Sequence, residues 1–376
     1  MKFADEYRDP ELGKKLIDRI HRHSSKPTKL MEFCGGHTVA IFKHGLRQLL
    51  PENIEMLSGP GCPVCVTASA DLDRAIALAR LPGVIVASFG DMVRVPGSHS
   101  SLQKAKADGA DVRIVYSVQD ALAIARDNPG KSVVFIGIGF ETTAPTIAAS
   151  VLQAEREGIN NYYVLSLHKL CPPIMKALLD LGEVRLSGII CPGHVSSIIG
   201  SHPYQFIPDD YNIACAISGF EPLDILLAID LLVNQIESGQ PGVEIAYRRG
   251  VRPEGNQQAL RLMEAVFEAG DANWRGIGLV PASGLRLKAQ YERFDAEKRF
   301  DIDPGPPHEP KGCICGSILR GVSTPLDCKL FRNSCTPEHP VGPCMVSSEG
   351  SCATYYHYGC VFRGNSATPG IRRGAG

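Results

Sequence analysis

Short apolar runs rich in β-branched residues alternate with stretches of helical character along roughly the first 240 residues of the chain. Each run ends near glycine or another small residue, which is the pattern of strands in parallel βαβ units. The expected strands are 30–33, 54–57, 84–89, 112–116, 132–138, 162–167, 188–190 and 212–217. The expected helices are 39–50, 68–79, 101–107, 118–126, 222–236 and 257–268.

Two groups of turn-forming residues divide the chain into candidate domains. Asp, Asn, Pro and Gly at 127–130 interrupt the helical pattern, because Pro and Gly break helices and favour turns. A Gly- and Pro-containing segment at 238–242 forms a second break. We therefore predict an α/β protein with a four-stranded parallel sheet in each of two domains, plus a third domain rich in helices and loops. The predicted domains are residues 29–127, residues 128–240, and residues 1–28 together with 241–376.

The charge balance excludes several classes of partner. The 376 residues contain 39 Lys and Arg against 40 Asp and Glu, a formal net charge of -1, and no basic block that could neutralise a row of phosphates. The N-terminus mixes charges at every turn, and no run of roughly eighteen apolar residues occurs. We expect a soluble, cytoplasmic protein that binds neither nucleic acid nor a membrane.

Thirteen cysteines in a chain without an export signal favour metal binding or redox chemistry over structural disulfides. Those near the C-terminus include the spacing C-x12-C-x6-C-x16-C, and four thiolates suit either a 4Fe-4S cluster or tetrahedral zinc. No C-x2-C pair typical of structural zinc sites occurs there, which favours the cluster. The spacing runs through Cys315, Cys328, Cys335 and Cys352, and it does not by itself exclude Cys313, Cys344 or Cys360 as ligands.

Unusual peptides follow several of the expected strands. Ligands in open parallel sheets lie beyond the carboxyl ends of the strands, and CGGH, GPGCPVC, GFETTAP and CPGHV all fall at such ends. Glu141 and His194, each just past a strand, are candidate proton donors or partners at this edge, although a structural hydrogen bond explains either equally well. The glycines at 137–139 lack the spacing of a phosphate-binding loop, so they are weak support for nucleotide binding.

Cys62 and Cys65 form a C-x2-C pair ahead of an expected helix. A helix N-terminus lowers the pKa of a thiol, so this pair is suited to cycle between dithiol and disulfide. Together with Cys34 and His37 it also forms a legitimate Cys3His zinc set, which we consider less favoured because zinc would block the redox chemistry. Three further cysteines are interpreted as small buried apolar residues, namely Cys171, Cys191 and Cys215.

Several long peptides, taken together, resemble the HypD family of hydrogenase maturation factors over nearly the whole chain. They are CGGH, GPGCPVCVT, GFETTAP, PGHV, SGFEPLD, CICGSILRG, DCKLF, CTP and MVSSEGSCATYY. The resemblance implies that Cys34 helps to hold the iron of the nickel-iron hydrogenase site while cyanide and carbon monoxide are attached. It implies that Cys62 and Cys65 are a redox-active pair, with His37 and His194 nearby. It also implies 4Fe-4S ligation in the third domain by Cys315, Cys328, Cys335 and Cys352.

The same resemblance implies a set of partners. HypC would supply a further cysteine ligand to the iron, and HypE, charged by HypF, would deliver the cyanide. We therefore hypothesise an iron-sulfur scaffold on which the Fe(CN)2CO group is assembled with electrons from a dithiol. A cluster-dependent thiol-disulfide reductase is the alternative, and a zinc-bound structural scaffold is a third. Infrared bands from the diatomic ligands and metal analysis distinguish the three.

Overall fold

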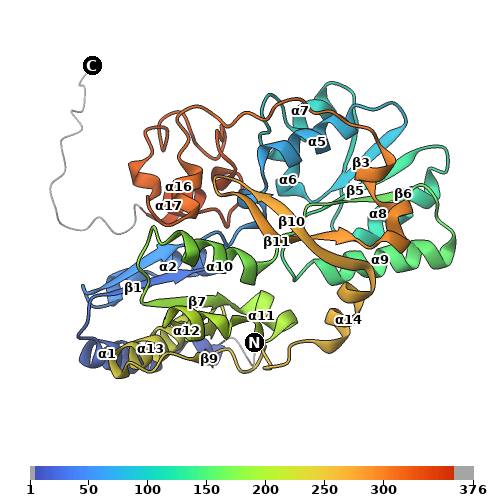
Figure 1. The fold of residues 1–376 in the computed structure, drawn as a ribbon. Helices are drawn as coiled ribbons and strands as arrows, with labels where there is room; N and C mark the ends of the chain where they lie inside the picture. The colour runs from blue at the N-terminus through green and yellow to red at the C-terminus, as the bar shows by residue number, and fades with distance from the viewer. Residues whose placement is uncertain (1–4, 360–376) are drawn as a thin grey trace, which may run out of the picture.

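The computed structural model describes residues 5–359, and Cys360 lies outside that range. Two parallel sheets and one antiparallel hairpin form its framework (Figure 1). In spatial order the first sheet contains β2 (Ile54–Ser58), β1 (Thr28–Glu32), β7 (Gly188–Pro192), β8 (Ala214–Ser218) and β9 (Val243–Ile245). The second contains β4 (Asp111–Ile114), β3 (Val84–Ser88), β5 (Ser132–Gly137) and β6 (Tyr162–Ser166). The α/β class and the parallel sheets are confirmed.

Helices connect the strands and cover the sheets (Figure 1). The first part of the chain contains η1 (Asp5–Arg8), α1 (Pro10–His23), α2 (Gly35–Lys43), α3 (Leu46–Leu49), α4 (Pro63–Val66), α5 (Ser69–Ala79), α6 (Gly90–Arg94), α7 (Leu102–Ala107), α8 (Val118–Asp127) and α9 (Ala144–Glu157). The middle contains α10 (Cys171–Leu181), α11 (Gly193–Ile199), η2 (His202–Tyr204), α12 (Phe206–Tyr211), α13 (Pro222–Ser238) and α14 (Gln257–Val266). The last part contains η3 (Ala289–Phe294), α15 (Ala296–Arg299), α16 (Cys315–Leu319), η4 (Pro325–Asp327), η5 (Pro343–Met345) and α17 (Ser351–Tyr358).

The assignment of strands to sheets differs from the prediction. The first sheet takes β1 and β2 from the first half and β7, β8 and the unpredicted β9 from the second, so it has five strands. The predicted boundary at 127–130 lies between α8 and β5, within the unit that builds the second sheet. The turn was read correctly as a break in a helix. It does not separate two sheets, because all of these strands carry the same apolar pattern and only tertiary pairing selects their neighbours.

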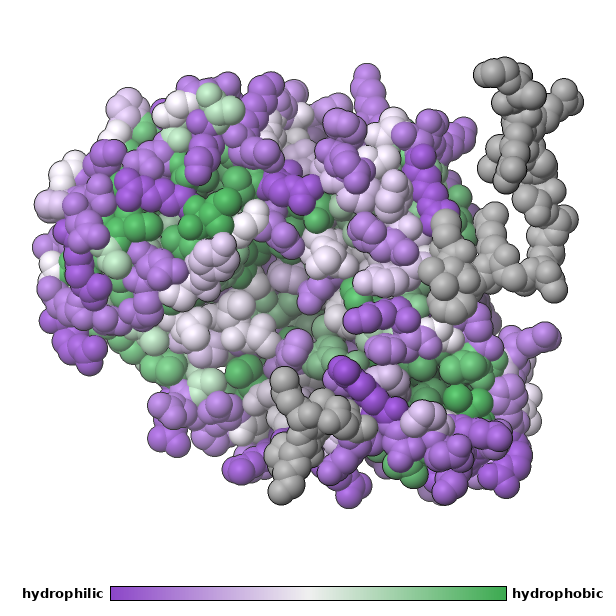
Figure 2. All heavy atoms as spheres, turned by 180° about the vertical axis from the view of Figure 1, so that it is seen from behind, coloured by the Kyte–Doolittle hydropathy of each residue, from purple (hydrophilic) through white to green (hydrophobic). Residues whose placement is uncertain are grey.

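One apolar core joins the two sheets. Side chains of Val86 and Ile136 from the second sheet belong to the same buried cluster as Ile189 and Ile217 from the first. A separate core lies under α13, on which α1 packs, and Arg19 of α1 makes an ion pair with the buried Asp230 of α13. Seen from behind, hydrophilic side chains dominate the rim of the molecule, while paler and apolar residues show toward its centre (Figure 2).

A hairpin lies between the two sheets and was missed by the sequence pattern. Its strands are β10 (Phe267–Trp274) and β11 (Gly278–Leu287), where the prediction placed the end of a helix and a mixed region. Trp274 forms an antiparallel bridge with Thr67, and Gly284 forms one with Lys169. The hairpin therefore ties the loop after β2 to the loop after β6. Among the described residues, no helix combines the length and the apolar character that a membrane crossing requires.

Trp274 is expected to be the principal anchor of this hairpin. Its side chain is 1 % exposed, and its indole N–H donates to the Ser283 hydroxyl at 2.8 Å. Replacing Trp274 by Ala should lower the free energy of unfolding by about 3–5 kcal/mol, because a large cavity replaces the ring. Leu279→Ala, which truncates a side chain 63 % exposed on β11, should change it by less than about 0.5 kcal/mol. Equal losses of thermal stability in both variants would contradict this assignment.

Candidate functional site

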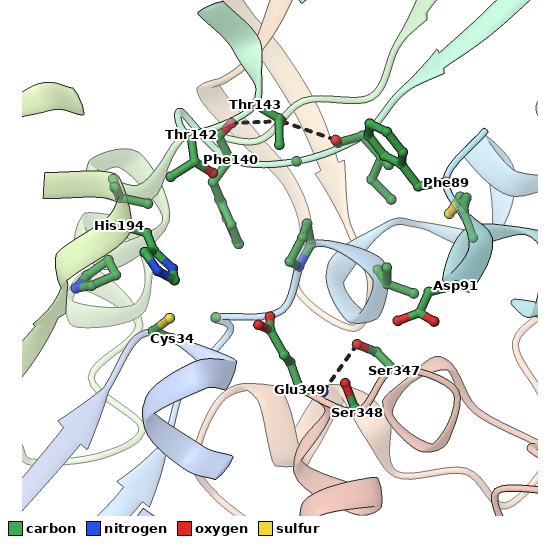
Figure 3. A pocket seen from close by; sticks show the side chains of 18 of the residues that line it. Cys34, Phe89, Asp91, Phe140, Thr142, Thr143, His194, Ser347, Ser348 and Glu349 are labelled. Atoms are coloured by element: carbon green, nitrogen blue, oxygen red, sulfur yellow. Dashed lines mark hydrogen bonds between the residues drawn. The ribbon is translucent and has the colours of Figure 1, made fainter. Parts of the chain in front are cut away.

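A cavity of about 510 Å³ lies where loops from both sheets and the C-terminal segment meet (Figure 3). Its walls come from the residues after β1, β2, β3, β5 and β7 and from Ser347, Ser348 and Glu349. The four peptides predicted to share one edge therefore do line or adjoin a common space. They meet although the predicted strand grouping was wrong, because every parallel strand delivers its C-terminal loop to the same end of its sheet.

Cys34 supplies a thiol to this cavity (Figure 3). It follows β1 directly, precedes the first turn of α2, and is 7 % exposed. Burial, together with the charges of Glu349 and Glu32, raises the pKa of the Cys34 thiol to about 12. The thiol is therefore protonated at neutral pH. A metal ion that binds the thiolate has to displace this proton.

Glycines allow three backbone segments to crowd around Cys34. A Cβ atom added to Gly61 would lie 2.3 Å from the Cys34 Cα, and one added to Gly35 would lie 2.4 Å from the carbonyl oxygen of Glu349. No side chain fits at such distances, so only glycine permits the approach. The Gly-rich parts of CGGH and GPGC therefore bring the Cys34 loop, the CPVC loop and the C-terminal segment into contact.

His37 and His194 occupy different places. His194 lines the cavity, whereas His37 is fully buried behind it. The His37 Nε2–H donates to the Gly219 carbonyl oxygen at 3.0 Å, and burial lowers the pKa of His37 to about 4, so its ring is neutral. Both imidazoles stack on Phe220, with ring centroids 4.8 Å and 3.9 Å away. Phe220 thus fixes both rings, a role that the SGFEPLD motif did not reveal.

Glu141 is buried in the loop after β5 and is 2 % exposed. Its Oε1 accepts a hydrogen bond from the Cys171 backbone N–H at 2.8 Å, while its Oε2 has no partner among the described residues. Burial raises the pKa of Glu141 to about 7. The side chain therefore holds the loop against the first residue of α10 and is partly protonated at neutral pH.

Cys62 and Cys65 form a disulfide at the start of α4. Both are buried, and Pro63 and Val64 between them line the cavity. A disulfide leaves no thiolates for a metal, and the Nε2 of His37 is already engaged, so the structure does not contain the Cys3His zinc set that was considered. Cys171, Cys191 and Cys215 are buried as predicted.

The C-terminal cysteines gather around a second, apolar cavity. Within residues 5–359 the walls include six thiols, from Cys313, Cys315, Cys328, Cys335, Cys344 and Cys352. No three or more His, Cys, Asp or Glu side chains of that range converge as they would on a single metal ion. A four-iron cluster places its iron atoms at separate corners, so its thiolates surround a space instead of meeting at a point. The Sγ atoms of Cys315 and Cys344 lie 2.9 Å apart.

Comparison with known proteins agrees with these features. Residues 11–359 match the HypD family model, described as "Hydrogenase formation hypA family". The chain belongs to the HypD family. It is 48 % identical to hydrogenase maturation factor HypD2 of Bradyrhizobium diazoefficiens, over 96 % of this chain and 97 % of that protein. It is 44 % identical to HypD of Escherichia coli, over 95 % and 98 % of the two chains. The resemblance inferred from the motifs is thereby confirmed.

Two acidic residues of this cavity were not part of the site predicted from the sequence. Glu349 precedes Cys352 by three residues in the chain, and its side chain projects toward Cys34 (Figure 3). Burial raises the pKa of Glu349, and the charge of Asp91 raises it further. The Asp91 loop follows β3 and carries no distinctive motif, so nothing in the sequence marked it. The Cys34 thiol and the carboxyl groups of Glu349 and Asp91 line the same cavity, but within residues 5–359 they do not converge as ligands of a single ion would.

The buried carboxyl of Glu141 gives a prediction about pH. Unfolded Glu141 ionises near its usual pKa of 4.5, whereas the folded protein retains the proton to about pH 7. Stability is therefore lost as the pH rises through this window, by an amount on the order of 3 kcal/mol. Glu141→Gln cannot ionise, so the difference between its thermal-unfolding midpoints at pH 5 and pH 8 should be smaller than that of the wild type.

A matched control for this measurement is Glu157→Gln on the exposed surface of α9. The pKa of Glu157 is lowered by its hydrogen bond with Arg126, so Glu157 is ionised throughout the tested range. The wild-type pH difference should persist in this control. An unchanged difference in Glu141→Gln would show that Glu141 does not titrate in that window.

Proposed function

We propose that this protein acts in nickel-iron hydrogenase maturation by holding an iron ion at Cys34 while its cyanide and carbon monoxide ligands are attached. The observation that carries the proposal is the Cys34 thiol in a cavity bordered by loops of both sheets. Thiolate sulfur is a soft donor suited to iron that also binds strong-field ligands. A volume of about 510 Å³ lies within the range of small-molecule sites.

The acidic surroundings support loading with a cation. Glu349 and Asp91 line the same cavity as Cys34; the charge of Glu349 opposes ionisation of the thiol, and the charge of Asp91 in turn raises the pKa of Glu349. An incoming divalent iron would reverse this balance, because its positive charge stabilises the thiolate and the neighbouring carboxylate of Glu349. The proton released from Cys34 leaves as the sulfur-iron bond forms. In this proposal HypC completes the iron coordination with a second cysteine, and HypE, charged by HypF, delivers cyanide.

The Cys62–Cys65 disulfide is the proposed redox partner of this site. Its reduction takes up two electrons and two protons and yields two thiols. Pro63 and Val64 bring the pair to the cavity wall, so dithiol and iron would be neighbours. A 4Fe-4S cluster in the second cavity would supply single electrons. The six thiols lining that space suit such a group.

The geometry favours one change in the proposed cluster ligands. The sequence prediction gave Cys315 as the first of four, yet its Sγ faces that of Cys344 at 2.9 Å, with both side chains buried. Two sulfurs this close are placed for a dithiol-disulfide pair. Of the six thiols, those outside this pair are Cys313, Cys328, Cys335 and Cys352, and we propose them as the ligands.

The alternative function, thiol-disulfide reduction of a protein substrate, fits the same geometry less well. An incoming thiolate must reach one sulfur of the disulfide directly. Cys62 is 3 % exposed and Cys65 is fully buried. Neither cysteine is among the residues that line the cavity, so a protein thiolate entering it does not meet the disulfide. The burial of the pair therefore favours the assembly scaffold.

Replacing Cys34 by Ala tests the iron site. Protein purified anaerobically with HypC should lose the infrared bands of cyanide and carbon monoxide, because the iron has lost its sulfur ligand. The visible absorbance of the cluster should be retained. Cys171→Ala removes a buried thiol that does not line the cavity, and this control should keep the bands. Bands of normal intensity in Cys34→Ala would refute the assignment.

Serine substitutions distinguish the two ligand sets. If Cys313 is a ligand, Cys313→Ser should lose most of the cluster iron and sulfide after anaerobic purification. Cys315→Ser and Cys344→Ser should both retain about four irons per chain, because they remove only members of the proposed pair. Loss of the cluster in Cys315→Ser, with retention in Cys313→Ser, would restore the set predicted from the sequence.

A further inference from the structure

Arg275, at the tip of the β10–β11 hairpin, is a buried cation next to the disulfide loop. Its side chain is 2 % exposed. Its backbone N–H donates to the Val66 carbonyl oxygen at 2.9 Å, and its Nε–H donates to the Thr67 carbonyl oxygen at 3.0 Å. These bonds fasten the guanidinium immediately after the Cys62–Cys65 pair. The hairpin thus places a fixed positive charge beside that pair.

The other side of the hairpin tip contacts the cysteine-rich segment. A Cβ atom added to Gly276 would lie 2.1 Å from the Gly316 Cα, so the two backbones touch one residue away from Cys315. Arg320 of the same segment donates to the Gly276 carbonyl oxygen at 2.5 Å. Arg275 lies close enough to Cys313, Cys315 and Cys344 for its positive charge to act on their sulfur atoms.

The charge of Arg275 is only partly compensated by its protein contacts. Its Nη1 makes a 2.6 Å ion pair with Glu309, a carboxylate that is 55 % exposed. Its Nη2 is buried and has no hydrogen-bond partner among the described residues. A buried guanidinium with an unused donor is costly unless an anion lies near it. Four thiolates around a 4Fe-4S cluster carry a net negative charge.

We propose that Arg275 is a positioning residue that supplies the positive counter-charge for the cluster and thereby raises its reduction potential. This inference rests on the cluster part of the proposed function, but not on iron assembly at Cys34. One-electron reduction adds one negative charge to the cluster, and no atom is transferred. A fixed cation stabilises this more negative form, so electrons enter the cluster at a less reducing potential.

The test is a spectroelectrochemical titration of the anaerobically purified full-length protein, with dithionite as the one-electron donor. Arg275→Met removes the charge while keeping an unbranched apolar stem. It should make the cluster harder to reduce, with the reduction equilibrium constant lowered by about tenfold, which is ~59 mV for one electron. Arg275→Lys keeps the charge and should remain within about threefold of the wild type.

A second variant predicts a shift of opposite sign. Glu309→Gln removes the carboxylate that partly neutralises Arg275, and the exposure of Glu309 makes the change tolerable to the fold. The cluster should then become easier to reduce, by about threefold in the equilibrium constant. Arg126→Met is the matched control, because it removes an arginine of α8 that is ion-paired with Glu157 of α9. Its potential should match that of the wild type.

The outcomes distinguish the proposed role of Arg275 from the presence of the cluster itself. Normal iron and sulfide content with an unmoved potential in Arg275→Met overturns this inference and leaves the cluster proposal intact. If Arg275→Met fails to retain a cluster, Glu309→Gln decides, and the absence of an upward shift there overturns the inference. A wild-type protein that contains no iron-sulfur cluster overturns both proposals.

Discussion

The parallel pairing of β1 with β7 is the contact on which the arrangement of the site depends. It aligns residues 30–32 with 188–190 and so joins a strand from the beginning of the chain to one from its middle. Because the two strands run in the same direction, Cys34 and His194 leave the sheet at the same edge. The second sheet shares a core with the first and brings the β3 and β5 loops to the same space.

Close packing around the cavity determines the ionisation of the groups that line it. Glycines at 35 and 61 let three segments approach Cys34 closely, and this closeness makes burial the dominant influence on its pKa. The cavity combines a protonated thiol with two carboxylates, while the neighbouring imidazole of His37 is held neutral. Next to the CPVC loop the charges have the opposite sign, since the buried cation Arg275 lies near a group of thiols.

The sequence predicted local features better than long-range ones. The strands were located because their apolar runs are local signals, and the motifs were placed together because strand ends of parallel sheets converge. The allocation of strands failed because pairing of β1 with β7 leaves no local trace. The hairpin was missed because β10 reads FEAGDANW, in which polar residues and glycine interrupt the alternation that marks a strand. Arg275 went unnoticed for the same reason, as its burial depends on where that hairpin ends.

Because the first sheet combines strands from distant parts of the chain, it cannot form until much of the chain has been translated. β2 ends at Ser58, but its sheet has no central strand until β7 begins at Gly188. At about 5–20 residues per second, the ribosome needs on the order of ten seconds to supply the intervening segment. During that interval Cys34 and the CPVC thiols lack the walls that later enclose them. During this period the sulfur atoms of Cys34, Cys62 and Cys65 are open to oxidants and metal ions, before the fold encloses them.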